Sequence, residues 1–285
     1  MATGGLSIIQ TMMNKLPQSE QKLAEYILQH PHEVVNSTVS ELSTSAKTSG
    51  AAVIRLCKSL GIKGFQDLKM RIAGDLMKTV EQGYRDIEPS ESLYRVVEKT
   101  TSNTIQIIRD TAEIIDHENL KTAIDMLLKA KNVHFFGVGA SNIVAQDAQQ
   151  KLIRINKGAT AFTDMHLIAT LIANSNPDDV LFAISFSGET QEIINLLKLA
   201  KERGVKTIGL THFGQSTVSS LCDVSVYTSF SNEPTFRSAA TSSRLAQLYM
   251  IDILFFGMAT EQYDETVQYI DNTRAAIKSM TEKNK

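Results

Sequence analysis

Cysteine is scarce in this sequence, and no long apolar run is found in it. The 285 residues include two cysteines, Cys57 and Cys222, which are far apart and form no CxxC pair. Two isolated cysteines argue against a disulfide framework and a structural zinc site, and they fit a reducing compartment. The longest apolar stretch, residues 248–258, is interrupted by Asp252 and Gly257, and it is shorter than the roughly 18 residues that a membrane span needs.

Strong charge of either sign is also missing. The formal net charge is -2, and 42% hydrophobic with 21% charged residues is ordinary for a globular protein. The chain starts without the basic and apolar segments of a signal peptide. We therefore expect a cytoplasmic protein that does not enter a membrane, and the length favours two domains.

Two short helices joined by a small polar turn are predicted between residues 37 and 61. Thr38 and Glu41 have the spacing of a capping box at the start of the first helix. Residues 48–50, Thr-Ser-Gly, interrupt the helical pattern, and a second helix follows from Ala51 until Gly61 ends it. This arrangement is typical of a helix-turn-helix motif.

Positive charge is concentrated around the second of these helices. Residues 51–78 contain six basic and two acidic residues, although the whole chain is slightly acidic. Small residues would allow close approach to a DNA groove, and cations there can meet phosphates. The predicted DNA contacts are Ser49, Gly50, Ala51, Arg55, Lys58 and Lys63. A solvated helical bundle with an ordinary basic face explains the periodicity and charge about equally well.

The rest of the chain divides into a connection and a second domain. We predict a helix-turn-helix domain over residues 1–78, and a linker with the start of a connecting helix over residues 79–105. The connecting helix runs from about Leu93 to Ile115 and leads into a domain over residues 106–285. No metal site and no cofactor are predicted for either domain.

Short apolar strands alternate with helical patterns in the second domain. This alternation predicts an α/β fold with a parallel sheet that has helices on both faces. In such sheets, ligands bind at the carboxyl ends of the strands. The predicted strands are residues 133–136, 160–162, 180–184, 205–211 and 224–228.

One of these strands leads into a turn that is rich in hydroxyl groups. Residues 180–184 are apolar, Ser185, Ser187, Gly188 and Thr190 follow, and a helical pattern begins at about Ile193. A helix start offers free backbone N–H groups and the positive end of the helix dipole, which suits a phosphate. Taken alone, such a turn is slightly better explained by ordinary helix capping.

Two further stretches resemble this turn. Gly139 and Ser141 follow the first strand in a Gly-x-Gly sequence, but Asn142 stands where a dinucleotide site has its third glycine. A small phosphate site is therefore favoured over an NAD site. The third stretch, residues 238–244, is again rich in Ser and Thr and opens a long apolar helix over residues 245–258.

The segments Gly137–Ser141 and Ser185–Thr190 resemble those of the sugar isomerase (SIS) domain, which has a flavodoxin-like, doubly wound sheet. A helix-turn-helix ahead of an SIS domain is similar to the RpiR family of bacterial transcription regulators, with the MurR-like branch most similar. The resemblance implies that Ser141, Ser185, Ser187 and Thr190 hold a sugar phosphate, with Gly139 and Gly188 allowing close backbone approach. It also implies a homodimer or homotetramer, with Glu233, Arg237 and Arg244 at the sugar or at the subunit interface.

Two functions remain in competition. The first is a DNA-binding regulator, acting as a repressor, that senses a phosphorylated sugar such as N-acetylmuramic acid 6-phosphate and releases its operator DNA. The alternative is an SIS-type isomerase or etherase with an appended helical domain, which would need a positioned base. The candidates for such a base form no recognised motif: His166, Glu189, His212 and Glu233. Glu189 is expected to face solvent or to accept a sugar hydroxyl. We therefore predict binding without turnover.

Overall fold

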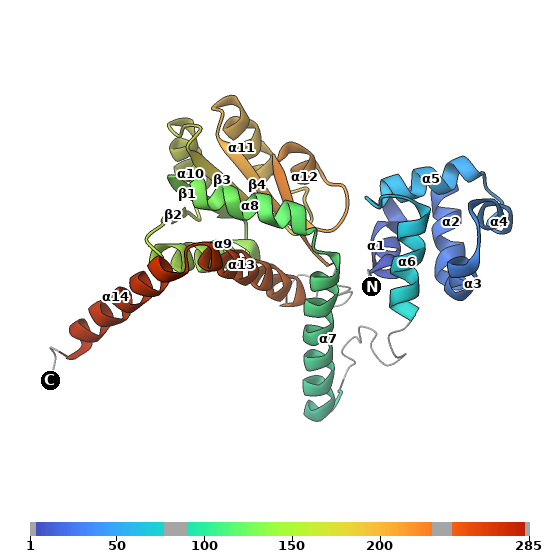
Figure 1. Ribbon diagram of the computed structural model, residues 1–285, viewed down its shortest axis with the longest axis horizontal. Coiled ribbons are helices and arrows are strands. Elements are labelled where there is room, and N and C mark those ends of the chain that lie inside the picture. The colour runs from blue at the N-terminus through green and yellow to red at the C-terminus, as the bar shows by residue number, and fades with distance from the viewer. Residues whose placement is uncertain (1–3, 77–89, 230–240, 283–285) are drawn as a thin grey trace. The chain divides into compact units, whose positions relative to one another are not determined.

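The computed structural model describes residues 4–76, 90–229 and 241–282. The chain forms two compact units (Figure 1). The first comprises residues 1–115, 212–215 and 227–246, and the second comprises residues 116–211, 216–226 and 247–285. Among the described residues, no helix combines the length and the apolar character needed to cross a membrane.

The first unit is helical. Its buried core includes Ile9, Leu23, Ile27, Leu56 and Leu68, which come from four different helices and are at most 1% exposed. The helices are α1 (Gly5–Met12), the short 3-10 helix η1 (Met13–Lys15), α2 (Gln18–Gln29), α3 (Pro31–Asn36), α4 (Val39–Ser45), α5 (Gly50–Ser59), α6 (Phe65–Leu76) and α7 (Leu93–Ile114).

The predicted helix-turn-helix is confirmed as α4 and α5. Thr38 Oγ1 accepts a hydrogen bond from the Glu41 N–H, and the Glu41 carboxylate accepts one from the Thr38 N–H at 2.7 Å, so the capping box is complete. Helix α4 ends with Lys47 in a left-handed conformation, at φ 50°, and the Thr48 N–H donates to the Ser43 carbonyl. This hydrogen bond pairs a carbonyl group at the end of α4, and Lys47 takes the left-handed position that glycine often occupies after a helix.

The remaining elements form a five-stranded sheet and its helices. The strand order is β2-β1-β3-β4-β5, which is the flavodoxin order, and the pairs β1–β2, β1–β3 and β3–β4 are parallel. The predicted α/β fold is therefore confirmed. The elements are α8 (His117–Lys129), β1 (Asn132–Gly137), α9 (Ala140–Arg154), β2 (Gly158–Ala161), α10 (Met165–Ala173), β3 (Asp179–Ile184), α11 (Gln191–Glu202), β4 (Lys206–His212), α12 (Thr217–Leu221), β5 (Val224–Thr228), α13 (Thr241–Glu261) and α14 (Tyr263–Glu282).

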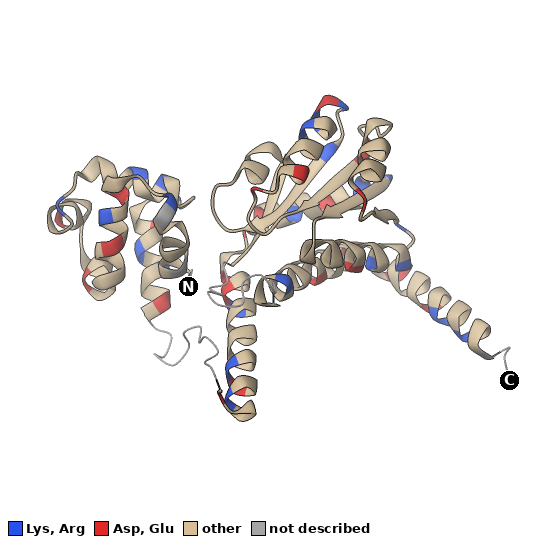
Figure 2. Cartoon of the chain, turned by 180° about the vertical axis from the view of Figure 1, so that it is seen from behind, with Lys and Arg blue, Asp and Glu red and all other residues tan. Residues whose placement is uncertain are grey.

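Both faces of the sheet are covered, as the unbroken apolar runs of its strands require. Phe135 and Phe182, whose ring centroids are 5.2 Å apart, lie among residues of α8, α9 and α13. The neighbouring Phe136 and Leu181 point to the other side and cluster with residues of α10 and α11. Figure 2 shows that the strands are mostly tan, with charged residues mainly on helices and loops.

Several boundaries differ from the sequence-based expectations because side chains cap the helices earlier. The apolar pattern of residues 120–129 predicts a helix that starts at Leu120. Asp116 accepts hydrogen bonds from the N–H groups of Glu118 and Asn119, so α8 begins earlier, at His117. Asp164 accepts from the His166 and Leu167 N–H groups in the same way, and α10 therefore begins at Met165, ahead of the start that the pattern of residues 167–173 predicts. Helix α12 was not predicted, because five residues are too few to show a helical period.

Candidate functional site

The turn between β3 and α11 is held together by its own hydroxyl groups. The Ser185 and Thr190 hydroxyl oxygens are 2.8 Å apart, and Ser185 Oγ also accepts a hydrogen bond from the Gly188 N–H. Ser187 Oγ accepts one from the Glu189 N–H. Ser185 is 2% exposed, whereas Ser187 and Thr190 are half-buried. The side chain of Thr190 does not cap α11, so ordinary helix capping does not account for this threonine.

Helix α12 is hydrogen-bonded to this turn through Glu189. The Glu189 carboxylate accepts hydrogen bonds from Thr217 N–H at 3.0 Å and from Thr217 Oγ1 at 2.6 Å. Glu189 is exposed, as expected, but its carboxylate also holds the start of α12, which the sequence did not indicate. These two hydrogen bonds fix the orientation of the turn relative to α12.

The structure gives Gly188 a packing role, besides the predicted approach of an anion. Gly188 has φ +69°, and a Cβ atom added there would lie 2.4 Å from Ser216 Cβ. The side of the glycine that lacks a Cβ is thus filled by the first residues of the α12 region. Glycine is required at this position for packing against Ser216.

The turn between β1 and α9 is built differently. At Gly137, an added Cβ would lie 2.6 Å from the Ser141 carbonyl oxygen, so glycine allows α9 to start close to the strand. Gly139 has φ +61°, and an added Cβ would meet nothing within 4 Å. Ser141 Oγ donates a long hydrogen bond, 3.4 Å, to Gln247 Oε1 on α13. The open space beside Gly139 is compatible with the predicted ligand approach.

The sheet register places these two turns at the same edge. Strands β1 and β3 are neighbours, and Gly137 pairs with Ile184 at the ends of the two strands. Ser141 and Ser185 therefore both follow the carboxyl ends of adjacent strands. This edge is where doubly wound sheets bind ligands.

The other residues predicted for the ligand are less informative. Arg244 lies half-buried in the first turn of α13. Glu233 and Arg237 lie outside the described residues, as does the start of the third hydroxyl-rich stretch. Ser242 and Ser243, which the prediction did not single out, are 8% and 6% exposed.

Three of the histidines lie in different environments. His134 is buried in β1 beside Thr160 Oγ1 at 3.0 Å, and burial lowers its pKa. His212 Nδ1 lies 2.7 Å from the Phe213 carbonyl oxygen, and His166 is exposed on α10. Within residues 4–76, 90–229 and 241–282, no three His, Cys, Asp or Glu side chains are placed to hold a metal ion.

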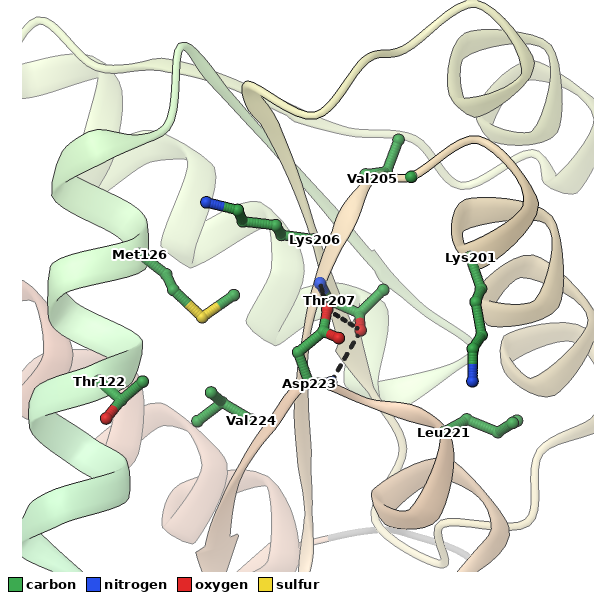
Figure 3. A pocket seen from close by; sticks show the side chains of 10 residues that line it. Thr122, Met126, Lys201, Val205, Lys206, Thr207, Leu221, Asp223 and Val224 are labelled. Atoms are coloured by element: carbon green, nitrogen blue, oxygen red, sulfur yellow. Dashed lines mark hydrogen bonds between the residues drawn. The ribbon is translucent and has the colours of Figure 1, made fainter.

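A pocket of about 460 Å³ opens at the opposite edge of the sheet, where β4 and β5 begin (Figure 3). Asp223 in this pocket accepts hydrogen bonds from the N–H and the hydroxyl of Thr207. The Lys201 and Lys206 ammonium groups point to different sides in Figure 3. Because the polar groups of this pocket do not converge, it is a weaker candidate site than the turn between β3 and α11.

Helix α5 presents four of its residues to solvent on one face. Ala51, Ile54, Arg55 and Lys58 are all exposed, and Ile54 is 57% exposed although it is a large apolar residue. The spacing of three and four residues places them on one side of the helix. An apolar side chain beside two cations suits a DNA groove, where it can contact bases while the cations contact phosphates. Ile54 was missed in the sequence because its apolar character suggested the core.

A buried carboxylate supports this face from behind. Glu20 on α2 is 3% exposed, accepts a hydrogen bond from Ser59 Oγ at 2.8 Å, and lies 3.8 Å from Arg55 Nε. Arg55 keeps about half of its side chain exposed, at 56%. The contact orients the arginine at its inner end and leaves its outer end accessible.

The other predicted DNA contacts have mixed environments. Ser49 caps α5 by accepting from the Ala52 N–H, and Gly50 begins the helix at a position where an added Cβ would make only an ordinary contact with Val39. Lys63 is exposed. Two other cations of the basic region are already engaged, since Lys69 donates to the Ser37 carbonyl and Arg71 pairs with Asp67.

A helix-turn-helix domain with a flavodoxin-like domain defines a two-domain transcription regulator. The family described as "Helix-turn-helix domain, rpiR family" matches residues 3–79, and the SIS domain family matches residues 126–257. The chain belongs to the RpiR family of helix-turn-helix transcriptional regulators with an SIS domain.

Two relatives illustrate the range of this family. The chain is 64% identical over 280 residues to YbbH of Bacillus subtilis (strain 168), named as an uncharacterized HTH-type transcriptional regulator, covering 98% of this chain and 99% of YbbH. It is 31% identical over 256 residues to the HTH-type transcriptional regulator HexR of Pseudomonas aeruginosa, covering 89% and 88% of the two chains.

Two solved structures are also similar. The Vibrio vulnificus NanR protein complexed with ManNAc-6P has a TM-score of 0.61 and 29% identity, covering 96% of this chain and 98% of NanR. The sugar isomerase domain of an RpiR transcription factor from Sphaerobacter thermophilus has a TM-score of 0.57 and 18% identity, covering 64% and 99%. The second likeness concerns the fold alone.

Proposed function

We propose that this protein binds operator DNA through α5 and releases it when a phosphorylated sugar binds at the carboxyl ends of β1 and β3. The observation that carries the proposal is the Ser185–Thr190 turn. When either hydroxyl of this pair donates to the other, one O–H group is left to donate to an anion. The start of α11 adds backbone N–H groups and the positive end of the helix dipole.

In this proposal each of three parts of the chain has its own role. Residues 1–78 bind DNA, residues 79–105 connect, and residues 106–285 bind the effector. The complex of NanR with ManNAc-6P supports a hexosamine 6-phosphate as the class of effector, because that protein is similar over nearly the whole chain. N-acetylmuramic acid 6-phosphate belongs to the same class and is the effector that the MurR-like resemblance suggests.

The protein acts without turnover of the sugar. Both relatives described above are named as regulators, which supports this reading. His212 is buried and Glu189 is engaged by Thr217, so neither is poised as a free base. A homodimer or homotetramer would present two α5 helices to the half-sites of a palindromic operator.

Effector binding alters operator affinity only if the two conformations of the protein differ in sugar-phosphate affinity. In this proposal, the DNA-released conformation binds the sugar phosphate more tightly. The ligand then relieves repression, since mass action moves the protein away from its DNA-bound state.

A screen of the 6-phosphates of glucose, N-acetylglucosamine, N-acetylmannosamine and N-acetylmuramic acid tests the proposal. We expect one of them to raise the thermal midpoint of the full chain and to weaken its binding to operator DNA in a gel-shift assay. Absence of binding by all four, or binding with no change in DNA affinity, would refute the proposal. A coupled assay that detects conversion of the bound sugar phosphate would favour the enzymatic alternative.

A further inference from the structure

Gln247 is a buried amide whose hydrogen bonds are not all made. This residue lies on α13 and is 2% exposed. Its Oε1 atom accepts the hydrogen bond from Ser141 Oγ, but its Nε2 atom is buried with no hydrogen-bond partner among the described residues. A buried donor that lacks a partner destabilises a protein, so an unpaired amide of this kind needs an explanation.

Turning the amide over does not remove the problem. The oxygen and nitrogen atoms of a glutamine side chain are interchangeable in shape, and their assignment follows the hydrogen-bond network. If Nε2 faced Ser141 it could donate to the serine oxygen, but Oε1 would then occupy the unpaired position. In either orientation, one polar atom of Gln247 lacks a partner.

The location of Gln247 indicates what the partner is. Its contact Ser141 belongs to the first turn of α9, beside Gly139, where an added Cβ would meet nothing within 4 Å. This turn is adjacent to the Ser185 turn, because β1 and β3 pair to their ends. Neighbouring strands are about 4.8 Å apart, which is close to the length of a sugar ring. A phosphate at the Ser185 turn would therefore bring its sugar to Gln247.

We infer that the Gln247 amide binds the sugar portion of a phosphosugar, through a hydroxyl or acyl oxygen, while the Ser185–Thr190 turn takes the phosphate. This inference rests on the proposed function and adds a selectivity residue to it. Ser141 holds the amide in place from the other side. Gln247 thus distinguishes between sugars, whereas the Ser185–Thr190 turn can bind the phosphate of any phosphate monoester.

The test compares Gln247→Met with the wild-type full chain. Methionine keeps the length of the side chain and removes both polar atoms. The probes are inorganic phosphate and the hexose 6-phosphate that gives the largest thermal shift on the wild type, with affinities measured by calorimetric titration. We expect the variant to bind the hexose 6-phosphate about ten-fold more weakly, the effect of one lost hydrogen bond, and to bind phosphate as the wild type does.

The stability of the ligand-free protein separates ligand binding from a structural role. Gln247→Met removes an unsatisfied buried donor, so its ligand-free thermal midpoint should equal or exceed that of the wild type. Gln150→Met, at an exposed position of α9, is the matched control and should change neither affinity. If Gln247→Met loses more affinity for N-acetylated sugar phosphates than for glucose 6-phosphate, the group that Gln247 binds is the acyl oxygen. If the losses of affinity are equal, that group is a hydroxyl.

Three results would overturn the inference. Unchanged hexose 6-phosphate affinity in Gln247→Met would show that the amide does not touch the sugar, even though the proposed function would stand. Equal weakening for phosphate and the hexose 6-phosphate would place Gln247 at the phosphate instead. If no hexose 6-phosphate bound the wild type, the proposed function would itself fail, and this inference with it.

Discussion

The hydroxyl oxygens of Ser185 and Thr190 lie 2.8 Å apart, across the turn that ends β3 and begins α11. One hydroxyl must donate and the other accept, and Ser185 also accepts from the Gly188 N–H. The pair therefore behaves as a single unit with one remaining O–H group. Removing either member breaks this hydrogen bond and changes which O–H group is available to an anion.

The first prediction concerns Ser187→Ala combined with Thr190→Ala. Each lost hydrogen bond to a charged phosphate should cost about 1.5–3 kcal/mol of binding free energy. Phosphosugar affinity should fall steeply in calorimetric titrations, and DNA binding without effector should persist in a gel shift. Thr170→Ala is a suitable control, because the Thr170 hydroxyl only donates to the His166 carbonyl within α10. Loss of folding in the double variant would instead assign these residues to structure.

The second prediction compares two glycines that both have a positive φ. Gly188 and Gly139 have φ +69° and +61°, but only at Gly188 would an added Cβ overlap Ser216. Both alanine variants incur backbone strain from the positive φ, of about 1–3 kcal/mol, and Gly188→Ala should lose additional stability through overpacking, typically about 1–3 kcal/mol. Urea denaturation of the two variants measures the difference.

Combining Gly188→Ala with Ser216→Gly should recover part of that loss, because the overlapping atoms are removed. Gly139→Ala should mainly weaken phosphosugar binding, since its methyl group enters the open space beside Ser141. No recovery of stability in the variant that combines Gly188→Ala with Ser216→Gly would show that Ser216 is not the reason for Gly188.

The third prediction concerns Arg55→Ala on α5. Loss of one phosphate contact should weaken operator binding and reduce the salt dependence of that binding by about one counterion. Phosphosugar affinity should be unchanged. Lys22→Ala, an exposed cation on α2, serves as the control for general charge loss. The opposite pattern, with intact DNA binding and weakened phosphosugar binding, would contradict the assignment of α5.

The fourth prediction concerns the two cysteines. Burial raises the pKa of Cys57 from 9.0 to about 11 and that of Cys222 to about 12. Both thiols should therefore stay protonated near neutral pH and react slowly with an aromatic disulfide reagent unless the protein is unfolded. Rapid labelling of the native protein would contradict the buried environments.

The same raised pKa values predict how stability depends on pH. Below about pH 9, the thiols are neutral in both the folded and the unfolded state, and their contribution is fully present. As the pH rises from about 9 to about 11, the unfolded thiols ionise first, so the free energy of unfolding should fall. Cys57→Ala with Cys222→Ala should show a smaller decrease over this range in thermal unfolding.

Local patterns accounted for most of the elements. The capping box at Thr38 and Glu41 marked the start of α4, and the apolar run before Ser185 marked β3. Such signals involve residues within a few positions of each other, so they can be recognised in the sequence. Boundaries were missed where a single aspartate, Asp116 or Asp164, moved a helix start by two or three residues.

The candidate site was only partly predictable. Ser185, Ser187 and Thr190 could be chosen because hydroxyl groups follow a buried strand. Gln247 could not, since its sequence surroundings resemble any buried helix and its unpaired amide exists only when α13 lies beside α9. Ile54 was missed for the opposite reason, because its apolar side chain is exposed where burial was expected.

The sequence by itself determined the order of helices and strands, the helix-turn-helix, and the two hydroxyl-rich turns after β1 and β3. Periodicity and helix capping depend on residues close together in the chain, so they can be recognised without knowledge of the fold. The tertiary structure decided that Ser216 fills the space beside Gly188, and that Gln247 meets Ser141 with one amide atom unpaired. These contacts join residues distant in the chain, and their distances follow from packing around the sheet.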